Sequence, residues 1–442
     1  MLMDEEKPKK RRKKAAAEGD GSAKEHKRPW QEMYATVEEI KTFLADRIYL
    51  RHNVVTGRTE CRVPERDWFG EDGTVIQEWQ PISDRVVNSL WAELSKAKMV
   101  RPQDIYRVME SDFVPDFNPF QYYLDQLPPW DGESDYILEM SVSVQVRGDV
   151  DEQMLFYAYL KKWLVAMVAG WIDAAVVNNV ILVLIGAQGS YKTTWFNYLL
   201  PPALKPYFYT KTNANRMGRD DLLTLTQYGL ICCEELDTMR PSELNQLKAA
   251  VTMPSIDERA AYAHFHEHRM HIASFCGTGN NPQFLCDPTG NRRWLPFEVE
   301  HIASPRDHPF NYAGIYAQAY ALYQEGFQYW FSAEEVQRLS AHNRQYETPR
   351  LEQELVQLYF RQPTGAEPGV FMSVARAMQL VSANISQKLS PVCLGRALGE
   401  QGFRRVKYQG QRGYIVVLRT AEEIQIAQRT MAAEAETDSS GQ

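Results

Sequence analysis

One stretch of sequence decides the fold: Val180-Ile181-Leu182-Val183-Leu184-Ile185-Gly186-Ala187-Gln188-Gly189-Ser190-Tyr191-Lys192-Thr193-Thr194. Its first six residues are apolar without alternation, which is typical of a strand buried on both faces of a parallel sheet. A loop with two glycines follows, and residues 195–200 continue it as a helical segment. This order of strand, loop and helix is what a phosphate-binding loop requires, because inward-turned N–H groups and the helix N-terminus both attract phosphate oxygens.

The loop predicts a nucleotide site with ATP and Mg²⁺ as cofactors. Lys192 is expected to reach the β- and γ-phosphates, and Thr193 to hold Mg²⁺ through its hydroxyl. Tyr191 stands where the usual pattern GxxxxGK[ST] has glycine, so its ring either crowds the loop or lies outside it. A tight turn that binds no nucleotide is the alternative. The residues expected at the nucleotide are Gly186, Ala187, Gln188, Gly189, Ser190, Tyr191, Lys192, Thr193 and Thr194.

Two more apolar runs, at residues 229–233 and 272–276, predict further strands and an α/β core over residues 151–300. The first run ends in Glu234-Glu235, where one carboxylate would lie near Mg²⁺ and the other would act as general base for the attacking water. We assign Glu234 to the metal and Glu235 to the base, and the reverse order stays open. The alternative is a pair of acids at an exposed strand end or helix N-terminus.

The last of these runs leads into Gly277-Thr278-Gly279-Asn280. Asn280, or its neighbour Asn281, would orient the lytic water against the γ-phosphate. Arg292 and Arg293 follow in a loop, which suits an arginine finger supplied by a neighbouring subunit. Taken alone, such a pair is more often a surface ion-pair site.

These motifs resemble a known family. Gly277-Thr278-Gly279-Asn280 followed by Phe284-Leu285-Cys286-Asp287-Pro288-Thr289-Gly290-Asn291-Arg292-Arg293-Trp294 is similar to the signature of the virulence-associated E proteins of phages and mobile elements. Further support comes from Asn118-Pro119, Trp130-Asp131-Gly132 and Asp257-Glu258-Arg259, so that the resemblance covers residues 118–300. That family resembles superfamily 3 helicases, which are AAA+-like ATPases that form rings, usually hexamers, and move on single-stranded DNA. The resemblance implies that ATP hydrolysis depends on Lys192, Thr193, Glu234, Glu235, Asn280 and Arg292 or Arg293.

Single-stranded DNA would be gripped in the central pore of such a ring. Residues 257–271 predict a hairpin that faces the pore, and basic and aromatic side chains there suit phosphates and bases. The candidate contacts are Lys248, Arg259, Phe265 and His266. A metal site at His264, His266 and His268 and a plain surface hairpin are the alternatives.

Duplex or origin DNA would bind near the C-terminus. Residues 371–419 carry eight Lys/Arg against one acid, Glu400, and predict two helices followed by a hairpin whose turn spans residues 409–413. This order resembles a winged-helix domain, whose second helix enters a major groove. The candidate contacts are Arg396, Arg404, Arg405, Lys407 and Arg412. Winged helices also bind proteins, which is the alternative.

The predicted fold class is α/β, with a P-loop AAA+-like ATPase core, a helical N-terminal region and a C-terminal winged-helix domain. Composition divides the rest of the chain. The expected parts are a disordered basic tail at residues 1–30, a helical oligomerisation region at 31–150, the ATPase core at 151–300, a helical lid or connector at 301–365, the winged-helix domain at 366–425 and a disordered tail at 426–442. The basic tail is either a solvated segment or an arm on nucleic acid.

Charge and cysteine content narrow the setting. With 49 Lys+Arg against 57 Asp+Glu the net charge is −8, but residues 7–14 and 371–419 each carry +7, so the remaining chain carries −22. Six cysteines without a CxxC pair favour a reducing compartment, the cytoplasm of a bacterial host. Asp173, Asn178 and Asn179 interrupt the most apolar stretch, so we expect no membrane span.

The sequence therefore predicts an ATP-dependent, ring-forming DNA helicase or translocase in the replication of a phage or mobile element. One rival is a non-motor, nucleotide-dependent DNA-binding or interaction protein in which Tyr191 has weakened turnover. Another is a defence or regulatory ATPase on the same core.

Overall fold

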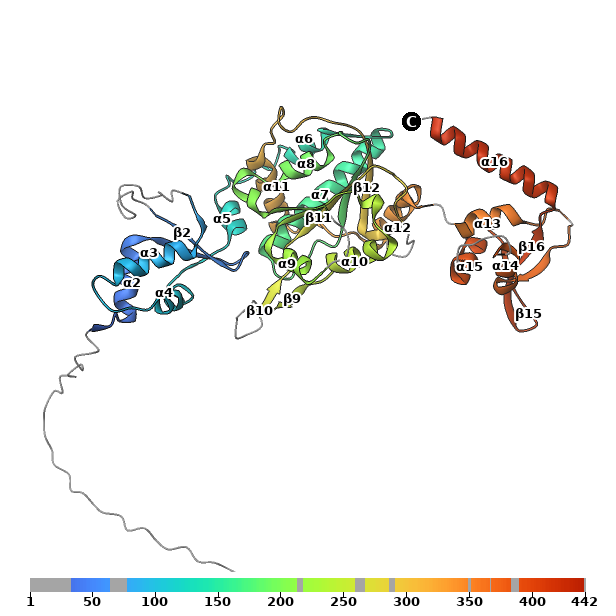
Figure 1. The fold of residues 1–442 in the computed structure, drawn as a ribbon. Coiled ribbons are helices and arrows are strands. Elements are labelled where there is room, and N and C mark those ends of the chain that lie inside the picture. Colours follow the sequence, from blue (N-terminus) through green and yellow to red (C-terminus); the bar gives the residue numbers. More distant parts are fainter. Residues whose placement is uncertain are drawn as a thin grey trace, which may run out of the picture. The chain divides into compact units, whose positions relative to one another are not determined.

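The computed structural model describes residues 33–63, 78–212, 218–258, 267–285, 291–348, 351–365, 367–382 and 389–440. The chain divides into two units between Asn118 and Pro119 (Figure 1). The basic tail expected at residues 1–30 lies outside the described residues. Helices and several sheets together confirm the α/β class.

In its described residues, the N-terminal unit contains a small sheet and three helices. The sheet has the strand order β3-β2-β1-β4, and β1 and β2 form an antiparallel hairpin. The helices bury Leu44, Leu90 and Ile105 in a core of their own. The elements are α2 (Val37–Arg47), β1 (Tyr49–Asn53), β2 (Arg58–Arg62), β3 (Gln80–Pro81), α3 (Asp84–Leu94), α4 (Pro102–Met109) and β4 (Asp116–Phe117).

This sheet differs from the mainly helical region expected over residues 31–150. The hairpin lacks the alternation of apolar and polar residues because Arg51, His52 and Asn53 follow one another in β1. The boundary differs too, since β5 (Val144–Val146) already belongs to the sheet of the second unit. A strand of three residues leaves too short a pattern to find from sequence.

The second unit is built on a six-stranded sheet in the order β5-β12-β6-β11-β8-β7. Only β5 runs antiparallel to its neighbour, and the other five strands are parallel. Burial on both faces explains the unalternated apolar runs, and every residue of β6, β8 and β11 is buried. The remaining strands of this sheet are β6 (Ile181–Ile185), β7 (Phe208–Lys211), β8 (Leu230–Cys233), β11 (Ser274–Gly279) and β12 (Trp294–Ile302).

Helices cover both faces of this sheet (Figure 1). On one face, α9 and α10 contribute Leu225 and Leu247 to an apolar core that includes Ile231 of β8. On the other face, α7 contributes Phe156, whose ring meets that of Phe297 on β12. The helices are α5 (Pro119–Asp125), α6 (Tyr136–Val142), α7 (Val150–Ile172), α8 (Lys192–Leu199), α9 (Arg219–Gln227), α10 (Pro241–Val251), α11 (Tyr312–Gln324) and α12 (Ala333–His342), with short 3₁₀ turns η2 (Pro202–Tyr207), η3 (Leu236–Thr238), η4 (Asn291–Arg293) and η5 (Asn343–Tyr346).

Helix α7 is long and apolar enough to cross a membrane by length and composition, and 67% of its most apolar stretch is buried inside the protein. Its burial has a specific cause, because the Trp163 indole N–H donates to the Phe275 carbonyl of β11 at 3.0 Å. The five cysteines in the described part of the chain are free thiols.

The C-terminal segment has its own core around Leu394, Leu398 and Val416. Its strands β14 and β15 both pair with β16. The hairpin turns at Gln409-Gly410, which both have positive φ, so Arg412 lies in a strand and not in the longer turn expected at residues 409–413. The elements are α13 (Leu351–Tyr359), β13 (Phe360–Arg361), β14 (Val370–Ser373), α14 (Val374–Val381), α15 (Pro391–Glu400), β15 (Arg404–Tyr408), β16 (Gln411–Leu418) and α16 (Ala421–Ser440).

Candidate functional site

Three parallel strands end at the same edge of the central sheet. In register, Gly279 of β11 lies beside Ile185 of β6, and Gly277 lies beside Cys233 of β8. The loops that follow these strands therefore meet, and they enclose a cavity of about 360 Å³. Its lining unites nearly all the residues predicted at the nucleotide: Gln188, Gly189, Ser190, Tyr191, Lys192, Thr193, Thr194, Glu234, Glu235 and Asn280, with Thr278 and Gly279.

Lys192 begins α8 and is buried beneath the loop. Its ammonium donates to the carbonyls of Gly186 and Ala187, both at 2.7 Å, and to the Ser190 hydroxyl at 3.2 Å. Burial lowers the pKa of Lys192, and the nearby Asp237 carboxylate opposes that shift. The lysine amine thus lies directly under the loop, where a phosphate would meet it.

Tyr191 takes the left-handed conformation, with φ 61 and ψ 12. Glycine adopts this conformation without the steric cost that a Cβ brings, which explains the glycine usual at this position. Tyr191 is 46% exposed, so the loop does not enclose its ring, although Tyr191 is among the residues that line the cavity. Gly186 is constrained differently, because a Cβ there would stand 2.9 Å from the Val299 carbonyl oxygen.

The two glutamates after β8 both line the cavity, but they differ in setting. Glu234 is half-buried and its N–H donates to the Lys211 carbonyl, whereas Glu235 is exposed and left-handed at φ 53. The left-handed residue turns the chain into η3, which brings Asp237 back toward β11. Their assignment to metal and base stays a prediction.

Asp237, two residues after Glu235, is a further acid beside this site. Its Oδ2 accepts the Asn281 N–H at 3.1 Å, and its Oδ1 is buried with no hydrogen-bond partner. Gly279 leaves room for it, since a Cβ there would lie 3.2 Å from Oδ1. The sequence places Asp237 two residues after the glutamate pair, but the left-handed turn at Glu235 is what directs its side chain toward β11.

These side chains fit Mg²⁺ and a nucleotide phosphate. The Thr193 hydroxyl and the Glu234 and Glu235 carboxylates are oxygen ligands, which Mg²⁺ prefers. Within the described ranges no group of three or more His, Cys, Asp or Glu side chains forms a ready metal cage. That also suits Mg²⁺, which keeps several waters and binds through one or two carboxylates and substrate phosphates.

Arg292 and Arg293 lie at the other edge of the sheet. Trp294, which follows them, pairs with Ile181 at the start of β6, whereas the loop begins after Ile185. Five strand residues separate the two edges, a span of about 13 Å. The arginines border a different cavity of about 610 Å³ with Asn178, Asn179 and Trp330.

Most of the predicted pore contacts, Arg259, Phe265 and His266, lie outside the described residues, and so do His264 and His266 of the alternative metal site. A hairpin is present, because β9 (Ser255–Glu258) pairs with β10 (Glu267–Met270). Lys248, the remaining predicted contact, is described: it is only 6% exposed on α10, near Leu285 and Trp294. Its contact with DNA stays a prediction.

The C-terminal hairpin presents its basic residues to solvent. Arg404, Arg405, Lys407 and Arg412 are exposed, and Arg396 on α15 is half-buried. Lys407 stands directly opposite Arg412, an arrangement of like charges that destabilises a hairpin. A surface that tolerates this repulsion suits an anionic partner.

Fold and site together define a mixed α/β protein whose strand, glycine loop and helix place a buried lysine beside two glutamates and an asparagine at one sheet edge. Residues 124–348, slightly more than half of the chain, match the virulence-associated protein E-like domain. The chain therefore belongs to that family.

Among curated proteins, none matches the sequence. Among solved structures, the apo structure of the NrS-1 C-terminal region (305–718) is 12% identical, covers 86% of this chain and 98% of its own, and has a TM-score of 0.44. An A-form apo structure of the same region has a TM-score of 0.43 at the same identity. Similarity at this level identifies neither fold nor activity.

Proposed function

We propose that this protein is an ATP-dependent, ring-forming DNA helicase or translocase in the replication of a phage or mobile element. One observation carries the proposal: a single cavity is lined by Lys192, Thr193, Glu234, Glu235 and Asn280, which come from the ends of three parallel strands. Membership of the virulence-associated protein E-like family supports the setting. A P-loop AAA+-like core is the architecture proposed for the central sheet.

Each side chain has a role in phosphoryl transfer to water. Lys192 binds the β- and γ-phosphates, and the loop N–H groups hold their oxygens. Glu235 takes a proton from the attacking water, and Asn280 orients that water. Mg²⁺, held through Thr193 and Glu234, neutralises charge on the phosphates when bound. Tyr191 is compatible with this chemistry because its ring is exposed.

The arginine finger comes from a second copy in this proposal. Arg292 and Arg293 stand at the sheet edge opposite the loop, so a finger from the same chain would have to cross the sheet. Exposed apolar side chains mark both edges. Val142, Val150 and Met154 lie around the end of β5 near the loop, and Trp330 lies beside the arginines. A head-to-tail contact between such unlike surfaces closes into a ring, and a hexamer is the expected size.

DNA enters at two places. Single-stranded DNA passes the β9–β10 hairpin in the ring's pore, and the C-terminal segment binds duplex or origin DNA. The order of helix, helix and hairpin in α14, α15, β15 and β16 supports a winged-helix domain there. Its phosphate contacts are Arg396, Arg404, Arg405, Lys407 and Arg412, and the host cytoplasm is the proposed location.

The test is ATP hydrolysis with and without single-stranded DNA, measured together with assembly state. Lys192→Ala should abolish hydrolysis, and Lys96→Ala, a change at an exposed lysine of the N-terminal unit, should not. Absence of hydrolysis in the wild type under every DNA condition would refute the motor. If nucleotide still drives assembly, the non-motor DNA-binding protein takes its place.

A further inference from the structure

The small sheet of the N-terminal unit has two unlike faces. Leu50 and Cys61 turn toward the helices and join the apolar core of the unit. Side chains alternate along a strand, so Tyr49 and Arg51 of β1 point to the other face, as do their cross-strand partners Arg62 and Glu60 of β2. On that second face Asn53 and Glu60 are buried, whereas Tyr49 and Arg58 are exposed. We call it the open face.

Aromatic rings and guanidinium groups alternate across the open face. The Arg51 guanidinium lies 3.5 Å from the Phe117 ring centroid and 4.2 Å from that of Trp79. Arg62 follows, 5.6 Å from the Trp79 centroid and 5.1 Å from that of Tyr49. The face is therefore a ladder of flat groups that runs from Phe117 to Tyr49.

At one end of this ladder the side chains stabilise the hairpin, and at the other end they are exposed to solvent. Arg51 is enclosed between two rings and forms an ion pair with Glu60 at 2.6 Å, and Glu60 also accepts from Asn53. These contacts hold the hairpin together. Tyr49, however, is 49% exposed, and Arg58, four residues before Arg62 on the same face of β2, is exposed as well. Their exposure leaves stacking surface and positive charge open to a ligand.

The charge on the face indicates what would bind. Arg51 and Glu60 cancel, which leaves Arg58 and Arg62 as two positive charges without an acid among the cross-strand pairs of the hairpin. The described part of the unit has 10 Lys/Arg against 11 Asp/Glu, so the positive charge is local to this face. Aromatic rings that take flat bases, next to arginines that take phosphates, are the combination that binds a single nucleic acid strand.

We propose that the open face of the N-terminal sheet binds single-stranded DNA, with a base stacked on Tyr49 and phosphates held by Arg58 and Arg62. The choice of DNA over RNA rests on the proposed function, whereas the stacking surface does not. An acidic peptide fits less well, because it would use the charge and leave the rings unoccupied.

The experiment measures binding of a fluorescein-labelled single-stranded oligonucleotide by the full chain without nucleotide. Tyr49→Ala should weaken binding about fivefold or more, the loss expected for one stacked base. Tyr49→Phe keeps the ring and should restore binding. Arg58→Ala should reduce the dependence of log affinity on log salt by about 0.7, as expected for one lost phosphate contact on a single strand.

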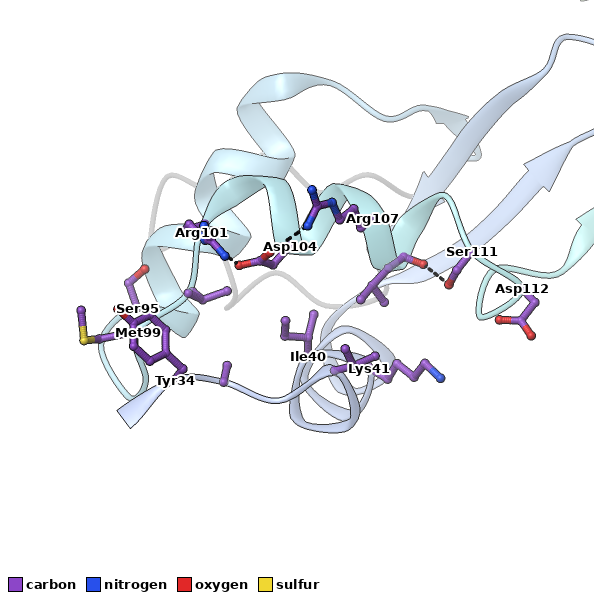
Figure 2. A pocket seen from close by; sticks show the side chains of 14 residues that line it. Tyr34, Ile40, Lys41, Ser95, Met99, Arg101, Asp104, Arg107, Ser111 and Asp112 are labelled. Carbon is purple, nitrogen blue, oxygen red and sulfur yellow. Dashed lines mark hydrogen bonds and ion pairs between the residues drawn. The ribbon is translucent and has the colours of Figure 1, made fainter. Parts of the chain in front are cut away.

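Matched controls lie in the same unit. Tyr34 is 45% exposed but borders a separate groove between α2 and α4 (Figure 2), so Tyr34→Ala should not change binding. Arg85→Ala, at an exposed position of α3, controls for the loss of a charge. Thermal unfolding of each variant separates lost binding from lost folding.

Because the chain is proposed to hold DNA elsewhere too, cross-linking must locate the strand. An oligonucleotide with 5-iododeoxyuridine should attach to the peptide that contains Tyr49. No cross-link in that peptide, or equal affinity of Tyr49→Ala and wild type, would overturn the proposal. Loss of RNA binding alone in Tyr49→Ala would replace DNA by RNA. Since no ATP is present, a protein that fails to hydrolyse ATP can still pass this test.

Discussion

The ammonium of Lys192 lies 3.5 Å from the side-chain oxygen of Asn280. One residue begins α8 and the other follows β11, so this contact joins the phosphate loop to the neighbouring strand. A γ-phosphate that binds Lys192 would therefore lie within reach of Asn280, where the attacking water must be oriented.

Asn280→Ala should consequently lower the rate of ATP hydrolysis much more than nucleotide affinity. We expect kcat to fall by about tenfold to a hundredfold, the loss typical of a single group that acts on the transition state. Lys192 keeps its contacts to Gly186 and Ala187, so the affinity for a fluorescent ADP analogue should change less than about threefold. Asn281→Ala is the matched control. An equal fall in kcat in Asn281→Ala would show that the effect is not specific to Asn280.

Tyr191→Gly should stabilise the protein. The left-handed conformation costs a non-glycine residue about 1 kcal/mol or more, and glycine removes this cost. Part of the resulting stabilisation is lost again, because glycine gives the unfolded chain more conformational freedom. Thermal unfolding should show a rise of a few degrees at most. Tyr191→Ala keeps the Cβ and should show no such rise. Equal stability of the two variants would mean that the left-handed backbone carries no cost here.

Much of the site was predictable because parallel strands bring their ends together. The apolar run before Gly186, the run before Glu234 and the run before Asn280 each marked a strand, and their common direction placed the three loops at one edge. What a pattern could not give was the direction of a turn. Asp237 reaches the site because Glu235 has a left-handed backbone conformation, and a glutamate in the sequence does not predict that conformation.

Two other features of the structure could not be predicted from the sequence, for different reasons. A lysine such as Lys248 is expected at the surface from sequence, but tertiary packing leaves it only 6% exposed. In the N-terminal hairpin, His52 breaks the alternation, because it follows Leu50 on the core-facing side of β1. Arg51, His52 and Asn53 are three polar residues in succession, so the sequence does not predict a strand there.

Asp237→Asn should alter the pH dependence of nucleotide binding. Burial lowers the pKa of Lys192, and Asp237 opposes this, so removal of the carboxylate charge should lower that pKa further. The phosphates need the charged ammonium. Affinity is therefore present below the Lys192 pKa and is lost as pH rises through it, and Asp237→Asn should lose it at a lower pH than the wild type.

Titration of ADP-analogue affinity from neutral to alkaline pH measures this shift. The asparagine oxygen can still accept the Asn281 N–H, so the turn is retained. Glu235→Gln removes an exposed acid of the same cavity and should leave the midpoint unchanged. Coincident midpoints for Asp237→Asn and the wild type would show that Asp237 does not act on Lys192.

Replacement of both Lys407 and Arg412 by alanine should weaken duplex DNA binding and flatten its salt dependence. The two exposed cations face each other across the hairpin, so both can neutralise phosphates of one backbone. Each lost contact should reduce the slope of log affinity against log salt by about 0.9. Relief of the like-charge repulsion should leave the hairpin at least as stable. Arg338→Ala on α12 controls for net charge, and an identical slope in the double variant would exclude the hairpin from duplex binding.

A mixing experiment separates a finger from a second copy from one in the same chain. Lys192→Ala disables the pocket but keeps the arginines, whereas a variant with both Arg292→Ala and Arg293→Ala keeps the pocket. Each alone should be inactive. Because the arginines lie at the far edge of the sheet, an intact pocket in a mixed ring can receive an intact arginine pair from its neighbour.

Random equimolar mixing makes about one interface in four intact, so hydrolysis should recover to about a quarter of the wild-type rate. A mixture of Lys192→Ala with Glu235→Gln carries both lesions on the pocket side, and no interface of that mixture is intact. Recovery in the first mixture and none in the second is the result expected of a finger that crosses between subunits. If neither mixture recovers although the subunits exchange, the arginines act within their own chain or do not act on ATP at all.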